Sequence, residues 1–281
     1  MAQLSWDCTP ELLALKDILT EASVEHQIEH FRELNDEAHT RWLSWTWKSF
    51  STGSVSSGCT LGGAPGTAPH AHAPGQLEKF IDKLMHSGHE YVFVKARLFR
   101  QGTSSNPYLK QMAYQGYLIN VEPANVAQRL MACREDLAAE WREDLVGLAS
   151  GCEAERLPHM QRLVRLATDA ALRRMLRDLA LVPSQAAAHD YLETFIAFHA
   201  DALGLDGDPY ALLAELGQRP LCGSGKSFID PPQIAAELRR MRQGIATAMA
   251  ETLACTPEAH RETEARFLEA CLRHTTRHPP T

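Results

Sequence analysis

Apolar and polar positions alternate most regularly along residues 91–100, which is the pattern of a half-buried β-strand. One side of this strand receives small apolar residues, from Val92 to Leu98. The other side receives aromatic and basic residues, namely Tyr91, Phe93, Lys95, Arg97 and Phe99. Residues 101–107 have the composition of a turn, and a second alternating run leads to Val121. We therefore predict an antiparallel β-hairpin.

Apolar residues recur every three or four positions through most of the remaining chain, which is typical of amphipathic helices. The clearest helix opens at Pro123 and carries a stripe wide enough to cover one face of the hairpin. Ser23 is expected to cap a second N-terminal helix, which contains Trp42 and Trp45. The predicted fold class is mainly α, with about seven to eight helices and one small antiparallel β-hairpin sheet.

Composition divides the chain into four predicted parts. Residues 1–50 form an N-terminal helical arm, and residues 51–75 are rich in Gly, Pro and Ser and are expected to form a flexible loop. Residues 76–150 hold a short helix, the hairpin and the long helix. After Gly151 the pattern is helical again, so residues 151–281 are expected to form a C-terminal bundle that packs on the hairpin unit.

Charge and cysteine content narrow the function classes. The formal net charge is -7 and the pI is about 6.0, which disfavours sequence-independent binding to nucleic acid or to an anionic membrane. No apolar run is long enough to span a bilayer. The seven cysteines are far apart and form no CxxC pair. Most are expected to be core residues, which favours the cytoplasm or another reducing intracellular compartment.

Two histidines form the first candidate site. His26 and His30 match the HxxEH pattern of one class of zinc proteases. They lie on the helix face opposite the apolar stripe, so a solvated charged face is favoured over a metal site. No cofactor is predicted.

A glycine loop forms the second candidate, with Gly223, Gly225, Lys226 and Ser227 in a segment that resembles the end of a phosphate-binding loop. The required earlier glycine is replaced by Pro220. An ordinary interhelical loop and a weak anion site both remain open.

The third candidate is the helix predicted over residues 184–203, which is apolar nearly all round and is therefore expected to be central. His199 is expected to be buried there, where it needs a hydrogen-bond partner or a ligand. Asp190 and Glu193 on a neighbouring face are either pocket carboxylates or a solvated edge.

These patterns favour a non-enzymatic, soluble intracellular binding or assembly protein with a protein partner, acting through the aromatic and basic hairpin face and the tryptophan-rich helix. Tyr91, Phe93 and Phe99 should then be accessible. The alternative is an enzyme or a small-molecule-binding protein with a pocket around residues 184–203, where His199, Glu193 and Asp190 would act, and an anion-binding loop at residues 223–227.

Overall fold

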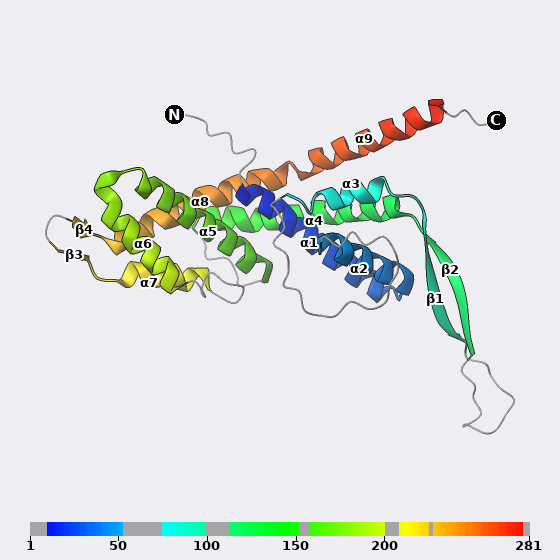
Figure 1. Ribbon diagram of the computed structural model, residues 1–281, viewed down its shortest axis with the longest axis horizontal. Coiled ribbons are helices and arrows are strands. Elements are labelled where there is room, and N and C mark those ends of the chain that lie inside the picture. Colours follow the sequence, from blue (N-terminus) through cyan, green and yellow to red (C-terminus); the bar gives the residue numbers. More distant parts are fainter. Residues whose placement is uncertain are drawn as a thin grey trace, which may run out of the picture. The chain divides into compact units, whose positions relative to one another are not determined.

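The computed structural model describes residues 10–52, 75–98, 113–151, 158–199, 208–224 and 227–277. These residues form a mainly helical protein with antiparallel two-stranded β-pairs, which confirms the predicted fold class (Figure 1). None of the helices in these segments is long and apolar enough to cross a membrane. Most of the predicted loop at residues 51–75 lies outside the described residues.

The chain divides into two compact units. Unit 1 comprises Met1–Leu15 and Asp136–Pro257, and unit 2 comprises Lys16–Glu135 and Glu258–Thr281. Helix α1 (Pro10–Glu33) and helix α4 (Pro123–Ala149) each contribute to both units.

Unit 2 contains the long hairpin and most of the N-terminal helices. The hairpin consists of β1 (Glu90–Leu98) and β2 (Ala113–Val121). The unit also contains α2 (Glu37–Ser51), α3 (Lys79–Met85) and nearly all of α9 (Thr256–Arg277). The core gathers large side chains from α1, α2, α3 and α4, including Phe31, Leu43, Phe80 and Leu130. The predicted stripe of α4 is largely confirmed, because Val126, Leu130, Trp141, Leu145 and Leu148 are buried.

The prediction that a helix begins at Ser23 is wrong. α1 runs through Ser23, whose buried Oγ donates a hydrogen bond to the Thr20 carbonyl at 2.8 Å. The break between α1 and α2 falls at Asn35, whose φ of 55° lies in the left-handed region that asparagine tolerates. Asp36 then caps α2 by accepting the His39 backbone N–H.

The two long strands pair in an unbroken antiparallel register from Glu90 opposite Val121 to Leu98 opposite Ala113. Helix α2 packs against both strands. The indole N–H of Trp42 donates to the Glu90 carboxylate at 2.7 Å, which ties α2 to the base of β1. The expectation that the long helix after Pro123 covers the hairpin is therefore wrong, because α2 takes that place.

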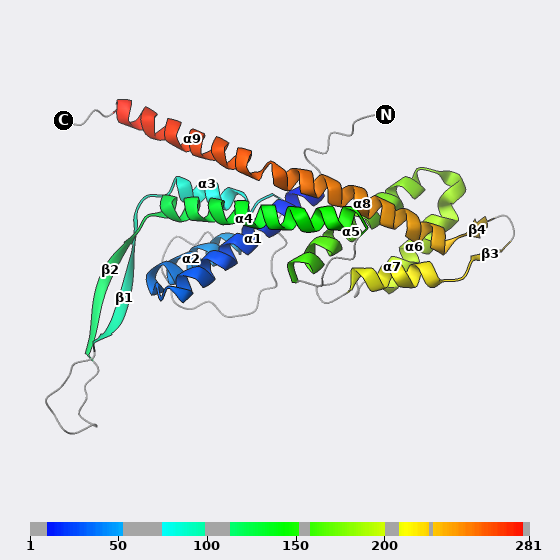
Figure 2. The same ribbon diagram turned by 180° about the vertical axis from the view of Figure 1, so that it is seen from behind.

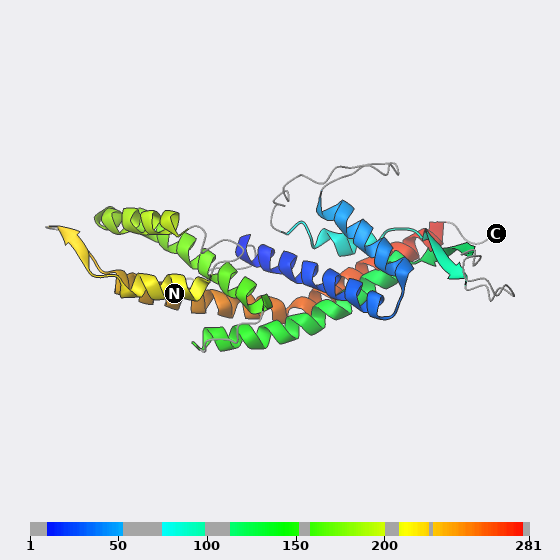
Figure 3. The same cartoon turned by 90° about the horizontal axis from the view of Figure 1, so that it is seen from below.

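Unit 1 is built from α5 (Pro158–Ala180), a 3-10 turn (Pro183–Gln185), α6 (Ala186–Phe198), α7 (Pro209–Gln218) and α8 (Pro231–Ala254). α7 runs beside α8, and α5 packs against α6 and α8 (Figure 3). The predicted central position of the helix around residue 192 is wrong, because Leu192 and Phe195 are its buried residues and Phe198 is exposed. A short second hairpin, β3 (Cys222–Ser224) with β4 (Ser227–Ile229), lies in the segment expected to be an interhelical loop or a weak anion site.

A buried charged cluster in unit 2 joins α1, α4 and the segment before α3. Asp17 accepts the N–H groups of Gly75 and Leu77 at 2.7 and 2.8 Å. Glu78 pairs with the buried Arg134 at 3.1 Å. Burial raises the pKa of Asp17 against the opposing effect of these two N–H groups, and it lowers the pKa of Arg134.

His260 attaches α9 to α4 within unit 2. Its Nδ1 lies 2.8 Å from the Glu135 carboxylate. An ionised carboxylate can only accept a hydrogen bond, so the ring N–H is the donor. Its Nε2 is buried and has no hydrogen-bond partner among the described residues. Burial lowers the pKa of His260, and nearby Arg134 lowers it further, against the opposing effect of Glu135.

Candidate functional site

One face of the long hairpin carries three large apolar side chains that are exposed among the described residues. Tyr91 is 68% exposed, Phe93 is 53% exposed and Leu118 is 66% exposed. Phe93 stands directly opposite Leu118 in the register, and Tyr91 is two residues before Phe93, so all three side chains lie on the same face. We call Tyr91, Phe93 and Leu118 the aromatic face.

The position of the Phe93 ring depends on a glycine of the neighbouring strand. A Cβ atom at Gly116 would lie 2.2 Å from Phe93 Cζ and 2.6 Å from Phe93 Cε2. The ring therefore lies over the bare backbone of Gly116, diagonally across the two strands. Aromatic cover of a strand glycine is a recognised way of stabilising it, and here it also fixes where the ring is presented.

The opposite face of the hairpin is covered near its base. Val94 is 4% exposed and Val121 is fully buried, and both belong to the side that α2 covers. Tyr117, which stands directly opposite Val94 on this face, is 46% exposed. Figures 1 and 2 show the hairpin leaving the helices of unit 2 and reaching away from them.

The five residues predicted to form a partner surface are placed as follows. Tyr91, Phe93 and Lys95 are exposed, as the binding hypothesis requires. Arg97 lies in β1, opposite Tyr114, but its side chain lies outside the described part. Phe99 also lies outside the described residues. The sequence reasoning missed Leu118, although the alternation of the second strand contained the signal.

The three tryptophans of α2 have different environments. Trp42 is a core residue, and Trp47 packs edge-on against Phe80 with ring centroids 5.0 Å apart. Trp45 alone of the three is mostly exposed, at 62%. Trp42 and Trp47 therefore pack within unit 2 instead of adding to a partner surface.

An apolar groove of about 470 Å³ lies at the base of the hairpin in unit 2, between the turn before β1, the start of α4 and α9. Phe267 and Cys271 line it from α9, and the His86 ring meets Phe267 edge-on at 5.9 Å. Cys271 is exposed, as are Leu268 and Leu272. The expectation that most cysteines are core residues is wrong for Cys271 and for Cys255, which is also exposed.

A smaller polar pocket of about 330 Å³ lies on the α1, α2 and α4 side of the hairpin base. His39 and Arg129 line it, and His39 Nδ1 lies 2.7 Å from Asp36. Burial opposes ionisation of Asp36, but the hydrogen bonds and charge of His39 together with Arg129 prevail and lower its pKa. The charges of this pocket balance one another, so it has no clear preference for an anion or a cation.

His199 lies at the end of α6, where it is the C-cap residue. Its Nε2 lies 3.2 Å from Glu215 of α7 and 3.2 Å from Arg219, the C-cap residue of that helix. Its ring packs against Phe195 at a centroid distance of 4.4 Å. Asp190 precedes His199 by nine positions on the same helix, about 13 Å along its axis. The structure therefore does not bring the proposed catalytic residues together.

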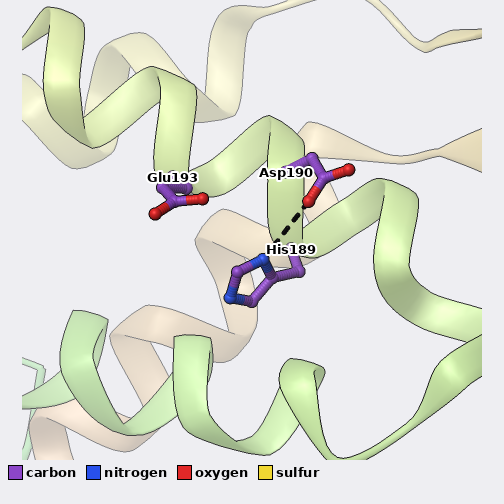
Figure 4. A group of neighbouring side chains, drawn as sticks. All are labelled: His189, Asp190 and Glu193. Atoms are coloured by element: carbon purple, nitrogen blue, oxygen red, sulfur yellow. Dashed lines mark hydrogen bonds and ion pairs between the residues drawn. The ribbon is translucent and has the colours of Figure 1, made fainter.

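Asp190 and Glu193 instead lie next to His189 (Figure 4). Ligand atoms of these three residues lie within 4.8 Å of one another, and His189 Nδ1 is 3.4 Å from Asp190. The sequence reasoning missed His189, although its spacing of four from Glu193 places both on one helix face. Both carboxylates are exposed, and exposed acidic groups of this kind are common without a bound metal.

The two remaining candidates gain little from the structure. His26 and His30 are exposed on α1, as expected for a solvated face. Gly223 lies in β3 and Ser227 opens β4, which pairs with β3, while Gly225 and Lys226 lie outside the described residues.

Comparison with known proteins adds no relative to this geometry, since no protein-family model, curated protein or solved structure matches the chain.

Proposed function

We propose that this protein is a non-enzymatic binding or assembly protein that holds a protein partner on the aromatic face of its hairpin. The observation that carries the proposal is the contrast between the two faces. Tyr91, Phe93 and Leu118 stand together in solvent, whereas Val94 and Val121 behind them are buried.

The energetic argument follows from the clustering of these side chains. Scattered apolar residues are normal on protein surfaces, but a contiguous group indicates a surface that another molecule covers. Burying apolar area yields about 25 cal/mol per Å², and aromatic side chains contribute most of the affinity at many interfaces. The ring of Phe93, held over Gly116, is already in one position before a partner arrives, which lowers the entropy lost on binding.

The enzyme hypothesis receives less support from the geometry. His199 is engaged by Glu215 and Arg219, and Asp190 and Glu193 lie too far along the helix to act with it. A pocket with convergent reactive groups is what that hypothesis requires.

Substitution of Phe93 tests the proposal, with a matched control elsewhere. Phe198 in α6 is 80% exposed, so Phe198→Ala removes a phenylalanine that is more accessible than Phe93 and lies outside the aromatic face. Tagged wild-type protein, Phe93→Ala and Phe198→Ala are used to capture partners from cells that produce the protein. Phe93→Ala should lower capture of the partner at least about tenfold, while Phe198→Ala retains it. Equal capture by Phe93→Ala and wild type contradicts the proposal.

A further inference from the structure

We infer that the partner segment held by the hairpin is extended and acidic, and that it adds to the hairpin as a third strand. This inference rests on the proposed function and specifies the chemistry of the partner. Two independent features lead to it: the charge of the hairpin sequence and the unpaired edges of its strands.

The hairpin is a basic region in an acidic protein. Between Tyr91 and Val121 the sequence contains four basic residues, Lys95, Arg97, Arg100 and Lys110, and no Asp or Glu. The whole chain has a formal net charge of -7, so the remainder of the chain carries all of the net negative charge. Lys95 is exposed on β1 two residues after Phe93. A partner with negative charge among its apolar residues is complementary to this combination.

The strands of the hairpin also offer free hydrogen-bonding edges. Among the described residues β1 and β2 pair only with each other, through nine consecutive residue pairs without a bulge. The outer edge of each strand therefore has backbone N–H and C=O groups that no strand in the described segments uses. Long, regular edges of this kind are templates for an added strand. Lys95 lies on the same side of β1 as Tyr91 and Phe93. Alternate residues of the added strand would extend this face, so apolar and acidic residues are both expected at every second position.

Two other occupants fit the observations less well. A second hairpin of the same protein would bring like charges together, since residues 91–121 contain four basic residues and no acidic ones. Nucleic acid would match the basic and aromatic residues, but the net charge of -7 repels a polyanion beyond the hairpin. An acidic protein segment is favoured because it needs negative charge only where the hairpin lies.

Peptide pools provide the test. One immobilised pool contains ten-residue peptides in which every second position is randomly Glu or an apolar residue and the positions between are Thr, and a second pool has Lys in place of Glu. The wild-type protein should be retained at least about tenfold better by the acidic pool, and the difference should shrink in 1 M salt, where the Debye length is about 3 Å. Hydrogen exchange of residues 90–98 or 113–121 should slow when the acidic pool is bound.

Substitutions separate charge from apolar contact. Lys95→Glu should lower retention by the acidic pool about threefold to tenfold, whereas Lys79→Glu, at an exposed lysine of α3 in the same unit, should leave it nearly unchanged. Phe93→Ala should lower retention and Phe198→Ala should not.

Each alternative outcome has a distinct meaning. If Phe93→Ala loses the cellular partner but the two peptide pools retain the protein equally, the acidic strand is wrong and the proposed function stands. If Phe93→Ala affects neither experiment, both are wrong. Tighter retention by single-stranded DNA than by the acidic pool, or dimerisation of the wild-type protein that Phe93→Ala abolishes, also overturns the inference.

Discussion

The hairpin of unit 2 and helix α6 of unit 1 both expose a phenylalanine, yet their surroundings differ. Phe93 belongs to a regular face with Tyr91 and Leu118, supported from behind by buried residues. Phe198 stands at the end of α6, beside the paired side chains of His199 and Arg219. Exposure alone therefore does not define an interaction surface. The hairpin differs from α6 because its exposed aromatic residues form a cluster with buried residues behind it.

The largest expected effect concerns the support behind the hairpin. Trp42 is 4% exposed and donates to the exposed Glu90, so Trp42→Ala leaves a cavity beneath the strands and removes this hydrogen bond. We expect the free energy of unfolding to fall by about 3–5 kcal/mol in chemical denaturation. Trp45→Ala, at an exposed tryptophan of the same helix, should change it by less than about 1 kcal/mol. Equal losses would show that the support is not specific to Trp42.

The next effect concerns His260, a buried histidine in the unit that carries the hairpin. Its folded-state pKa lies below the ordinary 6.5 because of burial, so the unfolded chain takes up the proton first. Stability should therefore fall as the pH drops through 6.5 toward the lower folded-state pKa, and the loss should stop below that pKa. Denaturation of the wild type and of His260→Gln at a series of pH values measures this loss.

The difference between the two proteins isolates His260, because the raised pKa of Asp17 contributes with the opposite sign in both. His260→Gln should lose less stability than the wild type on acidification. His26→Gln, at an exposed histidine, should behave as the wild type does. The same pH dependence in all three proteins would contradict the assignment.

The smallest effect on stability is expected at Gly116. Gly116→Ala places a methyl group where the Phe93 ring lies, and the ring, at the end of a flexible side chain, must move away. The free energy of unfolding should change by less than about 1 kcal/mol, because the backbone at this position is ordinary. Partner capture should nevertheless fall several-fold, since the ring is displaced. Gly88→Ala, whose Cβ would meet no atom within 4 Å, is the control.

The sequence could predict the exposed hairpin face because alternate residues of a strand point to opposite faces, so the two faces can be read separately. Val94 and Phe93 are neighbours with opposite environments, and a period of two separates them without any knowledge of the rest of the chain. The helix around residue 192 lacked such a contrast, because it is apolar nearly all round. A uniformly apolar pattern predicts that a helix is buried, but it does not predict how many of its faces other elements pack against. In the structure Phe198 is exposed.

Two further errors have local and long-range causes. Ser23 is a favourable cap, but the chain continues as a helix through it and breaks at Asn35, where a left-handed residue is tolerated. Which helix covers the hairpin depends on contacts between distant residues, such as Trp42 and Glu90, and periodicity within one element contains no information about them.

Photocrosslinking from the aromatic face tests the central claim most directly. The photoreactive amino acid p-benzoylphenylalanine is placed at position 93 in one variant and at position 198 in another, and both are irradiated in cells that produce the protein. We predict a defined adduct with a partner protein from position 93 and none from position 198. No adduct from position 93, or the same adducts from both positions, would contradict the assignment of the hairpin as the binding surface.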